Sequence, residues 1–198
     1  MSIGLKIILI EDQPDDAKLI VSRFTETVKW LETKGLLSEM KFDNMSMKYI
    51  EGSVKNIARG KEYNHYSEND IFRINDVLQK EKACNKVSIL TDIILDKKEV
   101  ERARVNDFTE IKMVNKICEA FENICPIYFI TGLLTYGSRA WSILGKENLC
   151  HRYIQKDLID IPSRKAIARA MYWLANSQEI PTSLSEKIEK KELEELEN

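Results

Sequence analysis

The sequence has few of the residues that would mark a zinc protein, a disulfide scaffold or a membrane-spanning chain. Its four cysteines, Cys84, Cys118, Cys125 and Cys150, form no close CxxC pair, and there are only two histidines. This composition disfavours a structural zinc site and is typical of buried, reduced thiols. No run of about eighteen apolar residues occurs, so we expect no membrane span.

Neither sign of charge dominates the chain, since 30 Lys and Arg residues stand against 32 Asp and Glu residues. We therefore expect no general attraction to nucleic acid or to anionic membranes. The first residues, MSIGLKIILIEDQPDD, lead directly into a predicted strand and carry acids where a signal peptide would have its cleavage site. We expect a cytoplasmic protein. The GxxxxGK[ST] and GxGxxG phosphate-binding loops are also absent from the sequence.

The most informative feature that is present is a set of apolar segments that end in polar groups. IILI precedes Glu11 and Asp12, VSILT precedes Asp92, IYFI precedes Thr131, and YIQ precedes Lys156. Such runs, rich in Ile and Val, are typical of buried strands in a parallel sheet, whose ligands bind beyond the carboxyl ends of the strands. We therefore expect three carboxylates, one hydroxyl and one ammonium to meet in a site for a metal ion and a phosphoryl group.

Strands and helices alternate along the predicted chain, which indicates βαβ units and a parallel sheet covered on both faces. The predicted strands are 6–10, 40–43, 87–91, 127–130 and 151–154. Five helices are predicted. The first begins at Pro14, the second begins with Asp70 as a cap, and the third carries Ile111 to Phe121. The fourth passes through Trp141 and Leu144, and the fifth covers 163–176.

Two parts of the chain lack this alternation. Residues 44–69 are polar without clear periodicity, although they hold several aromatic residues, and we interpret them as an insertion, either a hairpin or a partly ordered loop. Residues 179–198 are charged and rich in helix formers, which predicts a frayed amphipathic helix or a solvated tail rather than a coiled coil. We therefore expect one domain over 1–178 that carries the 44–69 insertion, followed by the 179–198 tail without an output domain.

The residues at the strand ends resemble those of the receiver domain of two-component response regulators. The resemblance covers residues 6 to about 176 and rests on Glu11-Asp12, Asp92, Thr131 and Lys156, in this order at successive strand ends. It implies an α/β, flavodoxin-like fold, which is a doubly wound five-stranded parallel sheet with strand order 2-1-3-4-5 and helices on both faces.

The resemblance also implies the chemistry of these residues. Asp92 would be the nucleophile that accepts a phosphoryl group. Glu11, Asp12 and Asp92 would hold Mg²⁺, with Glu11 acting through water. Lys156 would meet one phosphoryl oxygen as a point charge, and Thr131 would donate a hydrogen bond to another.

A switch and a set of partners follow from the same resemblance. Tyr153 matches the aromatic that changes rotamer as the Thr131 hydroxyl moves toward the phosphate, and it would signal to the face of the fourth helix, fifth strand and fifth helix. A homodimer through that face is one expected arrangement. We expect a stand-alone receiver that takes its phosphoryl group from a histidine kinase or a phosphotransfer protein and contacts a downstream protein. Its chemistry would be limited to self-phosphorylation and slow self-dephosphorylation.

Several features depart from the family pattern and leave an alternative open. Asp157 follows Lys156 where receivers usually have proline, and the chain between Asp12 and Asp92 is unusually long. Ile94 stands where an aspartyl phosphatase would carry a second acid. The alternative is a degenerate receiver that acts as a phosphorylation-independent interaction module. Single residues also have structural interpretations, since Asp12 could cap the following helix and Lys156 could be a solvated lysine.

Overall fold

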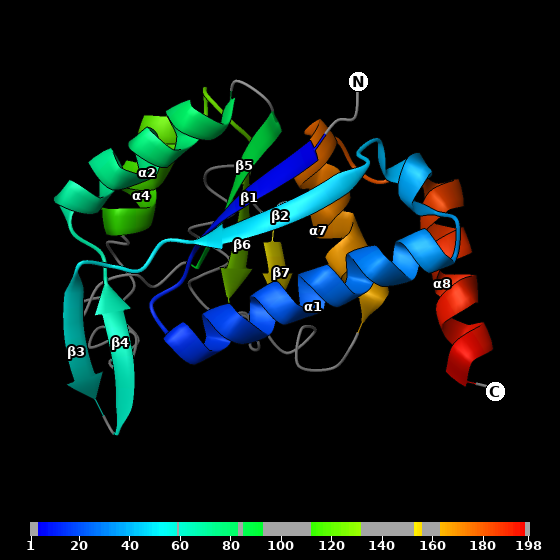
Figure 1. Ribbon diagram of the computed structural model, residues 1–198, viewed down its shortest axis with the longest axis horizontal. Helices are drawn as coiled ribbons and strands as arrows, with labels where there is room; N and C mark the ends of the chain where they lie inside the picture. Colours follow the sequence, from blue (N-terminus) through cyan, green and yellow to red (C-terminus); the bar gives the residue numbers. More distant parts are fainter. Residues whose placement is uncertain are drawn as a thin grey trace.

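A parallel sheet of five strands forms the centre of the protein, and helices cover both of its faces (Figure 1). The structure is a computed structural model that describes residues 4–58, 60–82, 85–92, 112–131, 153–155 and 163–196. The predicted α/β class and the parallel sheet are confirmed, and the architecture is consistent with a flavodoxin-like fold.

The order of the strands differs in numbering from the prediction. Neighbouring strands are all parallel, in the spatial order β2-β1-β5-β6-β7 rather than 2-1-3-4-5. The reason is a hairpin that lies between β2 and β5 in the chain and forms its own antiparallel sheet from β3 (Val54–Ala58) and β4 (Lys61–His65). The strands of the main sheet are β1 (Gly4–Ile10), β2 (Asn44–Tyr49), β5 (Asn85–Asp92), β6 (Ile127–Thr131) and β7 (Tyr153–Gln155).

The second strand lies later in the chain than predicted. Met40 ends the short 3-10 helix η1 (Leu37–Met40), and Lys41 follows with a left-handed φ of 61°. Met40 and Phe42 are buried in the core, so their apolar character reflects packing rather than a strand. β2 begins at Asn44, inside the range predicted as an insertion, and alternates between exposed and half-buried residues as an edge strand with one covered face does. The predicted strand at 40–43 is therefore wrong.

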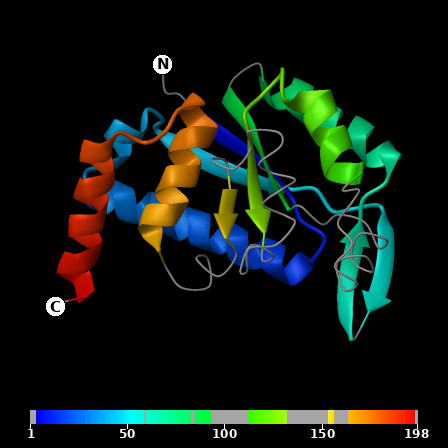
Figure 2. The same cartoon turned by 180° about the vertical axis from the view of Figure 1, so that it is seen from behind.

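Alternating side chains of β1 explain the two helical layers. Leu5, Ile7 and Leu9 pack in the core with residues of α1 and α7, whereas Ile8 and Ile10 pack with residues of α2 and α4. The two pairs of helices lie on opposite faces of the sheet (Figures 1 and 2). Both faces are covered, which is why β1 reads as a continuous apolar run. The helices of these two layers are α1 (Pro14–Thr33), α7 (Arg164–Asn176), α2 (Glu68–Lys82) and α4 (Lys112–Phe121).

The ends of α1 follow directly from the sequence. Pro14 occupies the first helical position, and Asp15 and Asp16 lie in the first turn, where the helix dipole favours negative charge. Beyond the other end, Gly35 has a φ of 68°, a conformation that glycine adopts readily. These ends place the start of the helix directly after the loop that carries Glu11 and Asp12.

The last helix, α8 (Thr182–Leu196), packs on the protein, whereas the sequence predicts a frayed helix or a solvated tail there. Leu184 and Ile188 are 2% and 0% exposed and belong to the same core as α1 and α7. The Nζ of Lys187 also lies 2.8 Å from a carboxylate oxygen of Glu39 in η1. A thin apolar stripe is thus sufficient for docking when charged partners flank it.

Within the described part of the chain, every helix is too short or too polar to cross a bilayer.

Candidate metal site

Three carboxylates meet at the carboxyl ends of the adjacent strands β1 and β5. The parallel register pairs Ile10 with Thr91, so that Glu11 and Asp12 come directly after β1, and Asp92 ends β5. One oxygen from each side chain can be chosen so that all three lie within 4.8 Å of one another. The side chains are buried, at 0%, 2% and 5% exposed. We call these three residues the acidic cluster.

The donor set of the acidic cluster suits a hard divalent cation. All three residues offer carboxylate oxygens, which Mg²⁺, Ca²⁺ and Mn²⁺ prefer, and neither cysteine nor histidine belongs to the cluster. Buried carboxylates this close repel one another unless a proton or a cation neutralises part of their charge. The cluster could therefore bind a metal ion.

Two tyrosines hold the backbone of Glu11. The Tyr66 hydroxyl accepts a hydrogen bond of 3.1 Å from the Glu11 N–H and also lies 3.1 Å from the Glu11 carbonyl oxygen. It donates a further, short hydrogen bond to the carbonyl of Ile50. The Tyr49 hydroxyl donates to the Glu11 carbonyl at 3.2 Å. Burial raises the pKa of both phenols, well above the usual value for Tyr66, so both stay protonated at neutral pH.

The hairpin also reaches the loop of the acidic cluster. The backbone N–H of Asn64 in β4 donates to the carbonyl of Asp12 at 2.6 Å. Its buried side chain donates to Glu51 at 3.0 Å and to the Tyr49 hydroxyl at 3.4 Å. Gly52 lies against the same stretch of β4 backbone, since a Cβ at that position would lie only 2.1 Å from the Asn64 carbonyl oxygen. This role of residues 44–69 has little signal in the sequence beyond several aromatic residues without clear periodicity.

Asp70 fixes the base of the hairpin to the start of α2. Its Oδ2 accepts hydrogen bonds from the Ser67 N–H at 2.8 Å and from the Ser53 hydroxyl at 2.7 Å, and its Oδ1 accepts from Arg73. Asp70 is the third helical residue, so it reaches back as in a capping box instead of being the N-cap itself. Burial raises the pKa of Asp70, but the hydrogen bonds from Ser67, Ser53 and Arg73 outweigh burial, and the pKa is lowered overall.

The remaining predicted site residues are described only in part. Thr131 ends β6, one residue beyond the position that pairs with Asp92, but its side chain lies outside what is described. Tyr153 begins β7 and packs, half-buried, against the core on the side of α2 and α4. Lys156 and Ile94 lie outside the described residues. The structure therefore brings together Glu11, Asp12 and Asp92 among the predicted residues.

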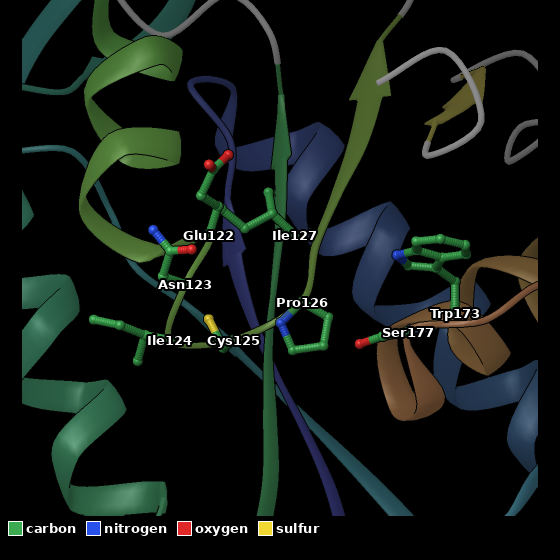
Figure 3. Close-up of a pocket in the computed structure, with 8 residues that line it drawn as sticks. All are labelled: Glu122, Asn123, Ile124, Cys125, Pro126, Ile127, Trp173 and Ser177. Atoms are coloured by element: carbon green, nitrogen blue, oxygen red, sulfur yellow. The ribbon is translucent and has the colours of Figure 1, made fainter. Parts of the chain in front are cut away.

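A hollow of about 350 Å³ lies at the amino end of β6, the end opposite to Thr131 (Figure 3). Cys125 and Pro126, which precede β6, form one side of it, and Trp173 and Ser177 at the end of α7 form the other. Pro126 accepts a hydrogen bond from Ile89, well before the carboxyl end of β5. Burial raises the pKa of the Cys125 thiol to about 11, so this thiol is protonated and poorly nucleophilic at neutral pH. The hollow is separate from the acidic cluster.

Comparisons of the chain with models of protein families, with curated proteins and with solved structures found no match.

Proposed function

We propose that this protein is a receiver-like phosphoacceptor, in which Asp92 takes a phosphoryl group from a histidine kinase or a phosphotransfer protein in the presence of Mg²⁺. Phosphorylation would then change the contacts of this protein with a downstream partner. One observation carries the proposal: Glu11, Asp12 and Asp92 lie together, buried, at the carboxyl ends of two adjacent parallel strands. Strand ends of this kind are where α/β sheets bind their ligands.

Asp92 is the nucleophile of the proposed reaction. One of its carboxylate oxygens forms a P–O bond while the P–N bond of the phosphohistidine breaks, and the imidazole leaves with the electron pair of that bond and is protonated. Asp12 and Asp92 would bind Mg²⁺ directly, and Glu11 would act through water. The bound ion would neutralise part of the negative charge of the reacting carboxylate and phosphoryl group. Thr131 and Lys156 would contact the phosphoryl oxygens.

The proposed switch would pass from Thr131 to Tyr153. These residues belong to the adjacent strands β6 and β7, where Phe129 pairs with Tyr153 and Thr131 with Gln155. Tyr153 is half-buried at the start of β7, the last strand in the order of the described sheet, and packs against the core on the side of α2 and α4. A rotamer change at this edge would alter the surface that a partner contacts.

The test is phosphorylation by acetyl phosphate with MgCl₂, read by intact mass. We expect the wild-type protein to gain one phosphoryl group, and chelation of Mg²⁺ to prevent the gain. Asp92→Ala should gain nothing, whereas Asp15→Ala, at a side chain that is 94% exposed, should behave as the wild type. A wild-type protein that stays unmodified, or a modification that persists in Asp92→Ala, would overturn the proposal.

A phosphorylation-independent interaction module is the second candidate function. The hairpin favours it, because Val54 and Ile57 are 50% and 77% exposed and apolar, as residues of a partner-binding surface often are. An NMR titration with MgCl₂ separates the two candidates. Shifts of the amide signals of Glu11, Asp12 and Asp92 would support the phosphoacceptor, and indifference of all three to Mg²⁺ would support the interaction module.

A further inference from the structure

We infer that Tyr66, together with the hairpin residue Asn64, positions the segment Glu11–Asp12 and thereby sets the metal affinity of the acidic cluster. Tyr66 is a positioning residue, because its hydroxyl contacts the backbone of Glu11. The inference about affinity rests on the metal site of the proposed function. The inference about position stands on the hydrogen bonds alone.

Where β1 and β2 separate, the hydroxyl of Tyr66 takes the place of a direct backbone hydrogen bond between the two strands. The ladder between these strands ends with Leu9 opposite Tyr49, followed by one hydrogen bond from Ile50 N–H to the Leu9 carbonyl. One residue further, the Tyr66 hydroxyl accepts from Glu11 N–H and donates to the Ile50 carbonyl. Tyr66 is only 4% exposed, so water has little access to these backbone groups if the hydroxyl is removed.

The same short segment holds the next residue as well. Asn64, two residues before Tyr66, donates its backbone N–H to the Asp12 carbonyl at 2.6 Å. Gly52 packs directly on this part of β4, since a Cβ there would lie 2.1 Å from the Asn64 carbonyl oxygen and 2.5 Å from the His65 carbonyl oxygen. Residues 64–66 thus hold two successive residues of the acidic cluster.

The position of this segment matters because it sets the distance between two of the acids and the third. Glu11 and Asp12 follow β1, whereas Asp92 belongs to β5. Mg²⁺ requires near-octahedral geometry with short metal–oxygen distances, so a small displacement of one strand end against the other weakens binding. Groups that orient metal ligands without touching the metal typically change affinity by about 10–100-fold.

The first test compares Tyr66→Phe with Tyr63→Phe, a matched change three residues earlier in β4, at a residue whose ring stacks on His65. We expect Tyr66→Phe to weaken Mg²⁺ binding about 10–100-fold in an NMR titration, and Tyr63→Phe to leave it nearly unchanged. Equal Mg²⁺ affinity in Tyr66→Phe and the wild type would overturn the inference while leaving the proposed function intact.

A second readout needs no metal. Without Mg²⁺, the amide proton of Glu11 should exchange with solvent faster in Tyr66→Phe than in Tyr63→Phe, because its acceptor is gone. If the wild type binds no Mg²⁺ but this exchange difference is present, the proposed metal site fails and the positioning role stands. If the exchange rates are equal, the positioning role is overturned whatever the wild type binds.

A third variant tests the contact between Asn64 and Asp12 through Gly52, which packs against the backbone of Asn64 and His65. Gly52→Ala should displace β4 from the Asp12 carbonyl and weaken Mg²⁺ binding as Tyr66→Phe does. The control is Gly60→Asn at the tip of the hairpin, where φ is 77° and no atom lies within 4 Å of the added Cβ. Wild-type affinity in a folded Gly52→Ala variant would count against the role of Asn64.

Discussion

The indole Nε1 of Trp30 donates a hydrogen bond of 2.9 Å to the carboxylate of Glu195, 165 residues further along the chain. The same carboxylate accepts from Lys34 at 2.6 Å and forms an ion pair with Arg164. The Arg164 guanidinium in turn lies 4.9 Å from the centre of the Trp30 ring. A single carboxylate on α8 therefore connects α1 with α7.

Glu195→Gln should weaken the docking of α8 in a pH-dependent way. Hydrogen bonds from Lys34, Arg164 and Trp30 lower the pKa of Glu195 from 4.5 to about 2. Because the folded-state pKa lies below the unfolded value, the stabilisation is complete above about pH 4.5 and is lost as the pH falls toward 2. We expect a loss of about 1 kcal/mol at pH 7, limited by the partial exposure of the group.

The measurement for Glu195 is urea unfolding of the wild type and Glu195→Gln at pH 7 and pH 3. The difference between the two proteins should shrink at the lower pH. Glu186→Gln, at an exposed position of the same helix, is the control and should show no such trend. A difference that is constant with pH would contradict the assignment.

Ile188→Ala should show that α8 belongs to the folded core. Ile188 is 0% exposed, and removing most of its side chain leaves a cavity that typically costs about 2–5 kcal/mol. Leu193, on the same helix, is 54% exposed, so Leu193→Ala should change the free energy of unfolding by less than about 0.5 kcal/mol. Equal, small effects of both substitutions in urea unfolding would mean that residues 182–196 do not contribute to the core.

Asp70→Asn should loosen the join between the hairpin and α2. The lowered pKa of Asp70 means that the charged form is favoured in the folded state, so its stabilisation is present above about pH 4 and is lost below the folded-state pKa. We expect a loss of about 1–3 kcal/mol at neutral pH and faster amide exchange at Ser67. Asp76→Asn, at an exposed position of α2, is the control for a change of charge alone.

Asp12→Asn should have opposite effects with and without metal. In excess chelator, replacing one of the three crowded, buried carboxyl groups by a neutral amide should leave the protein as stable as the wild type or more stable. In excess MgCl₂ the wild type should gain stability, by about 2.7 kcal/mol when Mg²⁺ is present at 100 times its dissociation constant, and the variant should gain little. Urea unfolding in both buffers measures this. A wild-type protein that is equally stable in both would contradict a metal site here.

The position of the acidic cluster could be predicted because two strong local patterns coincide. The apolar runs before Glu11 and Asp92 fill both faces of a covered sheet, so each run must end where the sheet meets solvent or a ligand. The parallel arrangement then puts both ends on one edge. The local sequence around each strand end is therefore enough to predict that these carboxylates lie together.

The contribution of Tyr66 could not be predicted in the same way. Its hydrogen-bond partner Glu11 is 55 residues away, and neither the alternation of polar and apolar residues nor any turn signal points to that pairing. The strand at Asn44 was missed for a related reason, since an edge strand with one covered face carries a weak apolar pattern. Likewise, the docking of α8 depends on Trp30, whose partner Glu195 lies on a distant helix.

The hairpin lengthens the connection that must close before β1 can pair with β5. Loop-closure entropy grows only with the logarithm of length, about 0.6 kcal/mol for each doubling, so the added length by itself lowers equilibrium stability very little. Pairing between distant segments nevertheless slows folding. We therefore expect the added length of the hairpin to lower the folding rate far more than it lowers the free energy of unfolding.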